Sequence, residues 1–333
     1  MQGDFFLTQW AFLGMRWLYE TLTGESIFFT ILISTVIVRG LSLIGDIKSR
    51  KSSLKMQAVQ PQLQKIQKKY ENDPQKLSIE QRKFMRENNV SMLGGCLPML
   101  ITMPLFFIFI AAFRQWGNEM MVKLILTLED NQQAGVEMFE KFKFLWVNNM
   151  WQPDNGFKPV IQTAAEFLGK ANEKLPQLLY FKENPAALQR FVDLGFFVKN
   201  GDAYSLAAVT DAVTVQYDAI VAPCAELYAG KNNGWFILPL LAGASMFLSS
   251  WISMRNQPQN DAAASSNKLM TWLFPLMSVW FCLSYNASFA LYWTVSSVFS
   301  IITTAIINRS FAKEKLALEA AGGNGPKVEV QRK

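Results

Sequence analysis

The sequence predicts an all-α polytopic membrane protein with five membrane-spanning helices and a cytoplasmic helical hairpin. Half of the 333 residues are hydrophobic and only 17% are charged, which is typical of membrane proteins. Five apolar stretches approach the roughly 20 residues that a helix needs to cross a hydrocarbon core. Basic residues flank alternate ends of these stretches, and the positive-inside rule places those ends in the cytoplasm. We therefore expect the amino terminus outside and the carboxyl terminus inside.

The first 24 residues are aromatic but lack the basic start and the small-residue cleavage site of a secretory signal. Phe6, Trp10, Leu13 and Trp17 recur at helical spacing, which predicts an amphipathic helix lying in the outer membrane interface. The alternative is a short first span. Three charged residues disfavour it, namely Asp4, Arg16 and Glu20.

The remaining segments follow from the apolar stretches and from the polar residues between them. The expected order is 1–24 interfacial helix, 25–47 first span, 48–91 cytoplasmic hairpin, 92–115 second span, 116–233 extracytoplasmic segment, 234–254 third span, 255–268 cytoplasmic loop, 269–285 fourth span, 287–308 fifth span and 309–333 basic cytoplasmic tail. The fourth span is short for a membrane crossing.

The hairpin segment is strongly basic and contains the turn signal Asn72-Asp73-Pro74, where a proline interrupts the helical pattern. Each predicted helix carries apolar residues that can face the other: Met56, Val59, Leu63, Ile66 and Tyr70 on the first, and Leu77, Phe84 and Met85 on the second. Two interpretations stay open. The hairpin is either a solvated connection or a moving arm that meets anionic lipid, a ribosome or an incoming chain.

Several classes of chemistry are excluded by composition. Histidine is absent, which removes Ser-His and Cys-His nucleophiles, histidine metal sites and imidazole proton relays. The three cysteines, Cys96, Cys224 and Cys282, are too scattered for a disulfide or metal framework, so we expect them to be packing residues. No GxxxxGK[ST] motif is present. We therefore predict a protein that is not an enzyme and needs no cofactor or metal.

Arg39 lies inside the first apolar stretch, where a guanidinium costs between about 3 and more than 10 kcal/mol. The five stretches, with the first taken as Ser26 to Ile44, contain no aspartate or glutamate. We therefore expect Arg39 to lie in a wet cavity, available to a carboxylate on another molecule. The alternative is snorkelling toward cytoplasmic head groups. Hydroxyls that could wet the cavity, or bond their own helix backbone instead, are Ser34, Ser42, Thr102, Thr294, Ser297, Thr303 and Thr304.

Six segments carry a family resemblance in order and spacing: "VRG", "KMQAVQPQLQKIQKKYENDPQKL", "LGGCLPMLITMPLFFIFIAAFR", "FLWVNN", "LMTWLFPLMSVWF" and "ALYWTVSSVFSI". They closely resemble the YidC family of membrane protein insertases, in the form without a large amino-terminal periplasmic domain. The resemblance implies five helices around a hydrophilic groove that is open to the cytoplasm and the lipid.

The resemblance also assigns residues to that substrate-binding groove. It implies that Arg39 contacts the substrate in the groove and that Thr102 matches a polar position on the second span. It also implies that Tyr292 and Trp293 match an aromatic pair along which nascent helices slide. Ser297 is added as a groove hydroxyl. No catalytic, cofactor or metal residue is expected.

The sequence departs from the family pattern in two places. The turn between the last two spans is Tyr285-Asn286-Ala287-Ser288-Phe289 rather than a proline-glycine type. The outer segment is also much longer than the family normally needs. Its part from Glu166 to Gly230 reads as a small domain, which is either a working part or a cap without a role in insertion.

The expected function is insertion and folding of membrane proteins without nucleotide hydrolysis, in the bacterial cytoplasmic membrane. The alternatives are an assembly chaperone acting with a separate translocation channel and, less favoured, a small transporter, which would normally need a membrane-embedded acid or histidine. Expected partners are nascent membrane proteins and the lipid bilayer. A ribosome and a Sec-type translocation channel are further candidates, and DNA is not expected.

Overall fold

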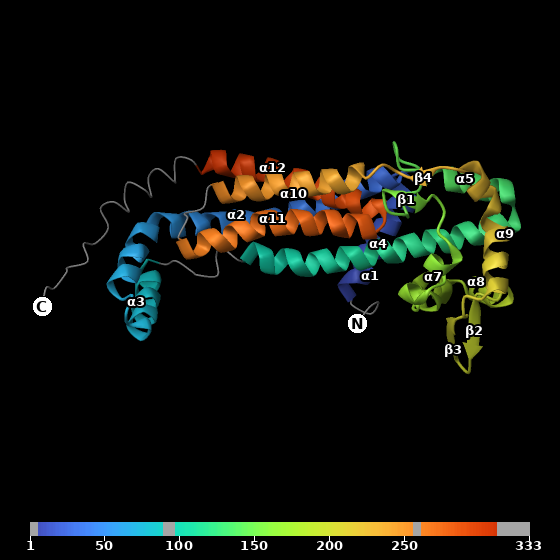
Figure 1. The fold of residues 1–333 in the computed structure, drawn as a ribbon, viewed down its shortest axis with the longest axis horizontal. Helices are drawn as coiled ribbons and strands as arrows, with labels where there is room; N and C mark the ends of the chain where they lie inside the picture. The colour runs from blue at the N-terminus through green and yellow to red at the C-terminus, as the bar shows by residue number, and fades with distance from the viewer. Residues whose placement is uncertain (1–5, 89–96, 256–260, 312–333) are drawn as a thin grey trace, which may run out of the picture. The chain divides into compact units, whose positions relative to one another are not determined.

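The computed structural model describes residues 6–88, 97–255 and 261–311 (Figure 1). The chain divides into two compact units. Unit 1 comprises Met1–Thr35, Phe106–Ala244 and Leu276–Val295, and unit 2 comprises Val36–Leu105, Ser245–Pro275 and Ser296–Lys333. Five long helices contribute residues to both units: α2 (Ile27–Lys69), α4 (Leu97–Asp130), α10 (Ile237–Arg255), α11 (Asp261–Ser284) and α12 (Ala287–Ser310).

These five helices overlap the five predicted spans. Two described segments are long and apolar enough to cross a membrane, Ile27–Ser49 and Ala287–Ser310. Ile237–Ile252 and Thr271–Ser284 are apolar but shorter. The number of spans and the side on which each terminus lies therefore stay predictions. The basic tail falls almost wholly outside the described residues, as does part of the loop at 255–268.

In unit 2, the helix α2 continues from the first apolar stretch into the hairpin without a break and ends at Lys69. The second hairpin helix, α3 (Pro74–Glu87), begins directly after the predicted turn. Asp73 caps it by accepting a hydrogen bond from the Lys76 N–H at 3.0 Å, and Pro74 occupies the first helical position, where a missing N–H costs nothing.

The predicted facing stripes of the hairpin are confirmed in their main members. Leu63, Phe84 and Met85 form a buried cluster, against which Met56 and Val59 pack. Ile66 packs there as well. A cluster of this size gives the hairpin a small apolar core of its own, so its two helices hold each other.

In unit 1, the chain begins with α1 (Phe6–Trp17), which continues into a π-helix, η1 (Leu18–Leu22). The residues predicted to share one face are all exposed: Phe6 64%, Trp10 64%, Leu13 40% and Trp17 60%. The opposite face is buried and consists of Thr8, Phe12 and Met15. The helix therefore has an outward apolar face, as an interfacial helix requires.

The helix α4 runs 34 residues to Asp130, well past the predicted end of the second span at residue 115. At about 1.5 Å per residue it is roughly 50 Å long, which exceeds a hydrocarbon core of about 30 Å. Met121, Leu124 and Ile125, beyond the predicted end, are fully buried in unit 1. The helix thus continues past the polar residues Arg114 and Glu119, while the bounds of the membrane span itself stay a prediction.

The outer segment packs around aromatic side chains. Phe167, Phe181, Phe191, Phe196 and Tyr217 are fully buried and make ring contacts with one another, such as 5.1 Å between the Phe181 and Phe191 centroids. The remaining elements lie in this segment: α5 (Gln132–Glu140), β1 (Asn155–Pro159), α6 (Ala164–Phe167), η3 (Lys170–Asn172), η4 (Leu175–Gln177), α7 (Leu179–Glu183), α8 (Pro185–Asp193), β2 (Phe197–Asn200), β3 (Ala203–Leu206), α9 (Asp211–Leu227) and β4 (Asn232–Asn233).

The all-α prediction needs one correction, because the outer segment contains four short strands. β1 pairs with β4, and β2 pairs with β3, both antiparallel. β2 and β3 are joined by Gly201-Asp202, and Gly201 has a φ of 63°. A two-residue loop that starts with glycine at positive φ is typical of a β-hairpin turn. The all-α prediction did not take this signal into account.

The turn between the last two helices is tight. α11 ends at Ser284 and α12 begins at Ala287, so only Tyr285 and Asn286 lie between them. Asn286 caps α12, because its Oδ1 accepts from the Phe289 N–H at 3.0 Å while its Nδ2 donates to the Phe113 carbonyl at 3.1 Å. An asparagine cap thus replaces the expected proline-glycine turn.

Candidate functional site

Arg39 lies half-buried on α2 and contacts the last helix. Its Nε donates to Ser296 Oγ at 2.6 Å. Ser296 is 3% exposed and its neighbour Ser297, a predicted groove residue, is 8% exposed. In the part of the chain that the structure describes, no carboxylate lies within ion-pair distance of Arg39. The guanidinium is therefore held by a neutral hydroxyl and not by an ion pair.

The expectation that the spans contain no carboxylate is corrected for α2. The apolar part of this helix extends to Ser49, past the predicted Ile44, and so includes Asp46. Asp46 follows Arg39 by seven residues, or two helical turns, and the Arg39 charge acts on it. Among the described residues no ion pair joins the two side chains, so Asp46 does not neutralise Arg39 by direct contact.

Tyr292 and Trp293 lie in an aromatic cluster between α4 and α12 within unit 1. The Tyr292 ring stacks on Phe109 at a centroid distance of 4.5 Å and is 7% exposed. Trp293 packs edge-on against Phe106 at 4.9 Å and also contacts Phe289. In this conformation the pair is part of the packing, so a sliding surface at these residues requires the cluster to open.

The other predicted hydroxyls divide into groups. Ser42, Thr294 and Thr303 donate to the carbonyl four residues earlier, as expected for hydroxyls in an apolar helix. The Ser34 Oγ is buried without a hydrogen-bond partner. Thr102 lies in α4, and its side chain is outside the described residues, as is Cys96. The structure thus brings Arg39 to Ser296, the residue next to the predicted Ser297.

Cys224 and Cys282 are buried free thiols, which confirms the packing role predicted for them. Burial raises the pKa of the Cys224 thiol to about 12, so this side chain remains protonated at neutral pH. A protonated, buried thiol is unreactive. This agrees with the expectation that the cysteines carry no chemistry.

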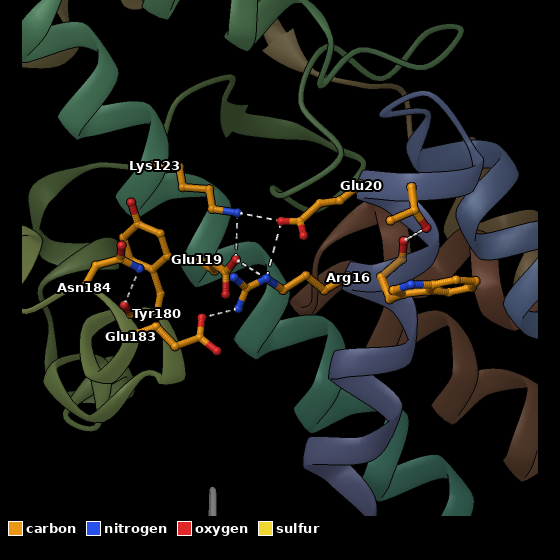
Figure 2. A network of polar contacts seen from close by, with 9 residues as sticks. Arg16, Glu20, Glu119, Lys123, Tyr180, Glu183 and Asn184 are labelled. Atoms are coloured by element: carbon orange, nitrogen blue, oxygen red, sulfur yellow. Dashed lines mark hydrogen bonds and ion pairs between the residues drawn. The ribbon is translucent and has the colours of Figure 1, made fainter.

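A charged network in unit 1 was not identified from the sequence (Figure 2). Glu119, on α4, is 1% exposed and lies 2.9 Å from Lys123 Nζ and 3.4 Å from Arg16 Nε. Arg16 Nη1 also contacts Glu183 Oε2 at 2.7 Å, and Lys123 Nζ contacts Glu20 Oε1 at 3.1 Å. The network therefore ties α1 and η1 to α4 and to α7.

The charges of this network stabilise one another. Burial alone would lower the pKa of Lys123, but Glu119 and Glu20 outweigh that effect and the pKa lies above its ordinary value. The same balance holds the pKa of Arg16 above its ordinary value, through Glu183, Glu119 and Glu20. Both cations are therefore charged at physiological pH. The i,i+4 spacing of Glu119 and Lys123 was visible in the sequence, but the contacts to α1 and α7 were not.

A second polar cluster that the sequence did not predict surrounds Asp154, which is fully buried and accepts hydrogen bonds from residues at the start of α10. Its Oδ1 accepts from the N–H groups of Trp235 at 2.7 Å and Phe236 at 3.0 Å. Its Oδ2 accepts from the Leu238 N–H at 2.7 Å and from Trp146 Nε1 at 3.0 Å. One carboxylate thus accepts from the N–H groups of the two residues that precede α10 and from one free donor of its first turn.

The "FLWVNN" segment supplies much of the surrounding framework. Asn149 N–H donates to Asn233 Oδ1 at 2.7 Å, and Asn233 Nδ2 donates back to the Asn149 carbonyl at 2.8 Å. The Met150 carbonyl accepts from both the N–H and the hydroxyl of Ser288 at 3.0 Å. Asn149 of this motif and the adjacent Met150 therefore hold β4, which precedes α10, and the first turn of α12 against this segment.

Comparison with known proteins identifies the family. The family described as 60Kd inner membrane protein matches residues 17–315. The chain is 34% identical to the membrane protein insertase YidC of Clostridium perfringens over 146 residues, which is 44% of this chain and 53% of the relative. It is 26% identical to YidC of Chlorobaculum parvum over 306 residues, covering 92% of this chain and 36% of the relative.

A third relative aligns along most of both chains. The membrane protein insertase MisCA of Bacillus subtilis is 22% identical over 306 residues, which is 91% of this chain and 78% of the relative. Against the first two relatives, the chain matches only about a half and about a third of their length, 53% and 36%. Because the family match extends over most of the chain, this protein belongs to the 60Kd inner membrane protein family, the family of YidC and MisCA, and is an integral membrane protein.

Proposed function

We propose that this protein inserts membrane proteins into the bacterial cytoplasmic membrane and assists their folding, without nucleotide hydrolysis. Family membership supports the proposal, since the relatives are named membrane protein insertases. The structural observation that carries it is the Arg39 guanidinium, held at 2.6 Å by the Ser296 hydroxyl within an apolar helix. A cation bound to a neutral partner is available to an anionic segment of an incoming chain.

The mechanism follows from electrostatics. Arg39, Thr102 and Ser297 line a hydrophilic groove that is open to the cytoplasm and to the lipid, among five spans with the amino terminus outside. An acidic leading tail enters this groove, where water and the Arg39 charge lower the cost of crossing the hydrocarbon. The membrane potential then favours outward movement of each negative charge by about 2.3 kcal/mol per 100 mV.

The hydrophobic segment of the substrate leaves the groove for the lipid. Tyr292 and Trp293, in the aromatic cluster of α4 and α12, form the surface along which it slides, and their ring contacts exchange with those of the substrate. Transfer of each buried methylene into the lipid is favourable by about 0.8 kcal/mol, so the segment supplies its own driving force. Nascent membrane proteins and the bilayer are therefore the partners.

The test uses purified protein in lipid vesicles and a single-span substrate whose leading tail is acidic or neutralised. Arg39→Ala should reduce the protease-protected fraction of the acidic tail about tenfold, the effect of about 1.4 kcal/mol, and should affect the neutral tail much less. Arg39→Lys should retain most of the activity, because a diffuse attraction needs a charge and not a planar fork.

The matched control is Arg309→Ala, which removes an exposed arginine at the end of α12. It should insert both substrates normally. Equal insertion of acidic and neutral tails by Arg39→Ala, at normal protein level, would refute the groove-charge mechanism. Vesicles with wild-type protein that accumulate no inserted substrate at all would instead favour an assembly chaperone that depends on a separate channel.

A further inference from the structure

A cavity of about 150 Å³ lies within unit 1, between α1, α4 and the segment 171–182 of the outer domain. This volume is about ten times the 10–15 Å³ that one bound water needs. Its lining includes three basic side chains, Arg114, Lys174 and Lys182, and one acidic side chain, Glu173. The pocket therefore carries an excess of positive charge and has room for a small anionic group.

Arg114 is held in place without losing its charge. Its Nε and Nη2 donate to Asn172 Oδ1 at 3.4 Å and 3.3 Å, and Nη2 also donates to the Ala171 carbonyl. Asn172 is itself fixed, because its Nδ2 donates to the Phe167 carbonyl at 3.0 Å. All of these acceptors are neutral. A guanidinium positioned by neutral oxygens remains able to bind an anion strongly.

The acid next to Lys182 in the sequence is engaged elsewhere. The neighbouring Glu183 is paired with Arg16 at 2.7 Å, and Figure 2 shows the Glu183 carboxylate directed into that network. Among the described residues, no carboxylate lies within ion-pair distance of Lys182. The charged network thus occupies the nearest acid and leaves the ammonium to the pocket.

The lining changes from apolar to polar along one face of α4. Ile110, Arg114 and Asn118 all line the cavity and follow each other at intervals of four residues. The helix α1 contributes Gln9 and also Thr8, which lies on the buried face opposite the exposed aromatic side chains. A ligand in this site therefore contacts an apolar side chain at Ile110 and a cation at Arg114, one helical turn further on. A lipid offers the same sequence, with apolar chains next to a charged head group.

We propose that this pocket binds the phosphate head group of an anionic lipid in the outer leaflet, an inference that rests on the membrane placement in the proposed function. The phosphate contacts Arg114 and the two lysines, and the acyl chains lie along Ile110 and Ala111, the apolar residues that α4 contributes to the lining. A free phosphate shares the same chemistry, so the test must separate the two sources.

The test uses the full chain in an uncharged detergent, with native mass spectrometry to measure bound phosphatidylglycerol. The variant Lys174→Gln/Lys182→Gln should bind roughly tenfold more weakly than wild type. The matched control Lys143→Gln/Lys199→Gln removes the same charge from exposed outer positions away from the pocket and should bind within about twofold of wild type. Equal weakening in both variants would overturn the proposal.

Two further arms identify the ligand. Phosphatidylcholine should bind clearly more weakly than phosphatidylglycerol, and inorganic phosphate at equal concentration should not displace the bound lipid. Displacement by phosphate would make the site one for a soluble anion and would overturn the lipid assignment. A phosphatidylglycerol with a photoreactive head group should crosslink to the segments around Gln9 and 171–182, and crosslinks confined to other segments would also overturn it.

The same variants separate this inference from the proposed function. Lys174→Gln/Lys182→Gln should insert the single-span substrate at a normal rate, because neither lysine belongs to the proposed groove. Lipid binding is measured without a substrate, so a protein that fails to insert can still bind the lipid, which would refute only the proposed function. A protein that inserts normally but does not bind the lipid would refute only the lipid site.

Discussion

Polar side chains have different kinds of hydrogen-bond partner in the outer segment of unit 1 and around Arg39 in unit 2. In unit 1, buried polar side chains bond to residues far away in the sequence, as Asp154 does with Trp235 and Leu238. Around Arg39, hydroxyls such as Ser42 bond their own helix, and the arginine has a single hydroxyl acceptor on another helix. The first region is held as a scaffold, and the second leaves a charge available to a ligand.

This contrast predicts which substitutions should change stability and which should change insertion activity. A buried polar group in the scaffold cannot lose its partner without a large cost in the free energy of unfolding. A charge with one neutral partner can change with little cost in stability and a large effect on activity. Stability and insertion should therefore respond to different residues, and each prediction below tests that separation.

The largest effect is expected at Asp154. Asp154→Ala leaves three backbone N–H groups and the Trp146 indole without an acceptor, so we expect a loss of at least about 3 kcal/mol in the stability of unit 1. The measurement is thermal unfolding in detergent micelles, with limited proteolysis of the outer segment. Asp193→Ala, which removes an exposed acid on α8, is the control and should change stability by less than about 0.5 kcal/mol.

The neighbouring glycine provides an independent check. Gly234 has a φ of 104°, and a Cβ placed on it would overlap the Asp154 carboxylate. Gly234→Ala should therefore reproduce the loss seen with Asp154→Ala, in the same direction and at the same elements. A stable Gly234→Ala protein would show that Asp154 does not need this tight geometry.

The next effect concerns the charged network. Glu119→Ala leaves Arg16 and Lys123 without their buried partner, and we expect a loss of about 3 kcal/mol. Hydrogen exchange should then show faster opening of α1 and η1. Glu137→Ala, on an exposed face of α5, is the matched control. Unchanged exchange in α1 would mean that its apolar contacts alone hold it.

A smaller and more local effect is expected in the hairpin. Leu63→Ala removes a central side chain of the Leu63-Phe84-Met85 cluster and should cost about 2 kcal/mol in the free energy of local opening. Hydrogen exchange in α3 should rise while the unfolding temperature of unit 1 stays constant. Faster exchange in α3 together with a lower unfolding temperature of unit 1 would show that the hairpin and unit 1 unfold as one cooperative unit.

The smallest effect is a pH dependence at Glu166. Burial alone would raise the pKa of this carboxyl, but hydrogen bonds from Lys158, the Thr163 N–H and Gln152 outweigh it, so the pKa is lowered. The ionised form therefore stabilises the folded state above the ordinary pKa of a glutamate, and this contribution is lost as the pH falls through the lower, folded value.

Glu166→Gln should accordingly be less stable than wild type at neutral pH and nearly equal to it in acid. Unfolding temperatures measured from pH 7 down to about pH 3 test this, since the ordinary pKa of a glutamate is about 4.3. Glu173→Gln, with its exposed carboxyl, serves as the reference. A constant difference between Glu166→Gln and wild type at every pH would contradict the assignment.

Much of the architecture could be predicted from the sequence because hydropathy, helical spacing and turn residues act locally. The exposed face of α1, the Asn72-Asp73-Pro74 turn and the stripe around Leu63 all depend on residues within a few turns of one another. The short strands were missed because they alternate weakly and lie between helical patches. The continuation of α4 beyond the predicted span was not anticipated, because the sequence does not show that Glu119 is buried among ion-pair partners.

For the candidate site, the sequence alone predicts a cation in an apolar helix and shows that no histidine or nucleotide motif accompanies it. The partner of Arg39 could be found only from the fold, since Ser296 is 257 positions away. The same holds for the Asp154 cap, the Arg16-Glu119-Glu183 network and the pocket at Arg114. Each joins segments distant in the chain, and the register in which such segments meet is set by packing between them, which no local pattern records.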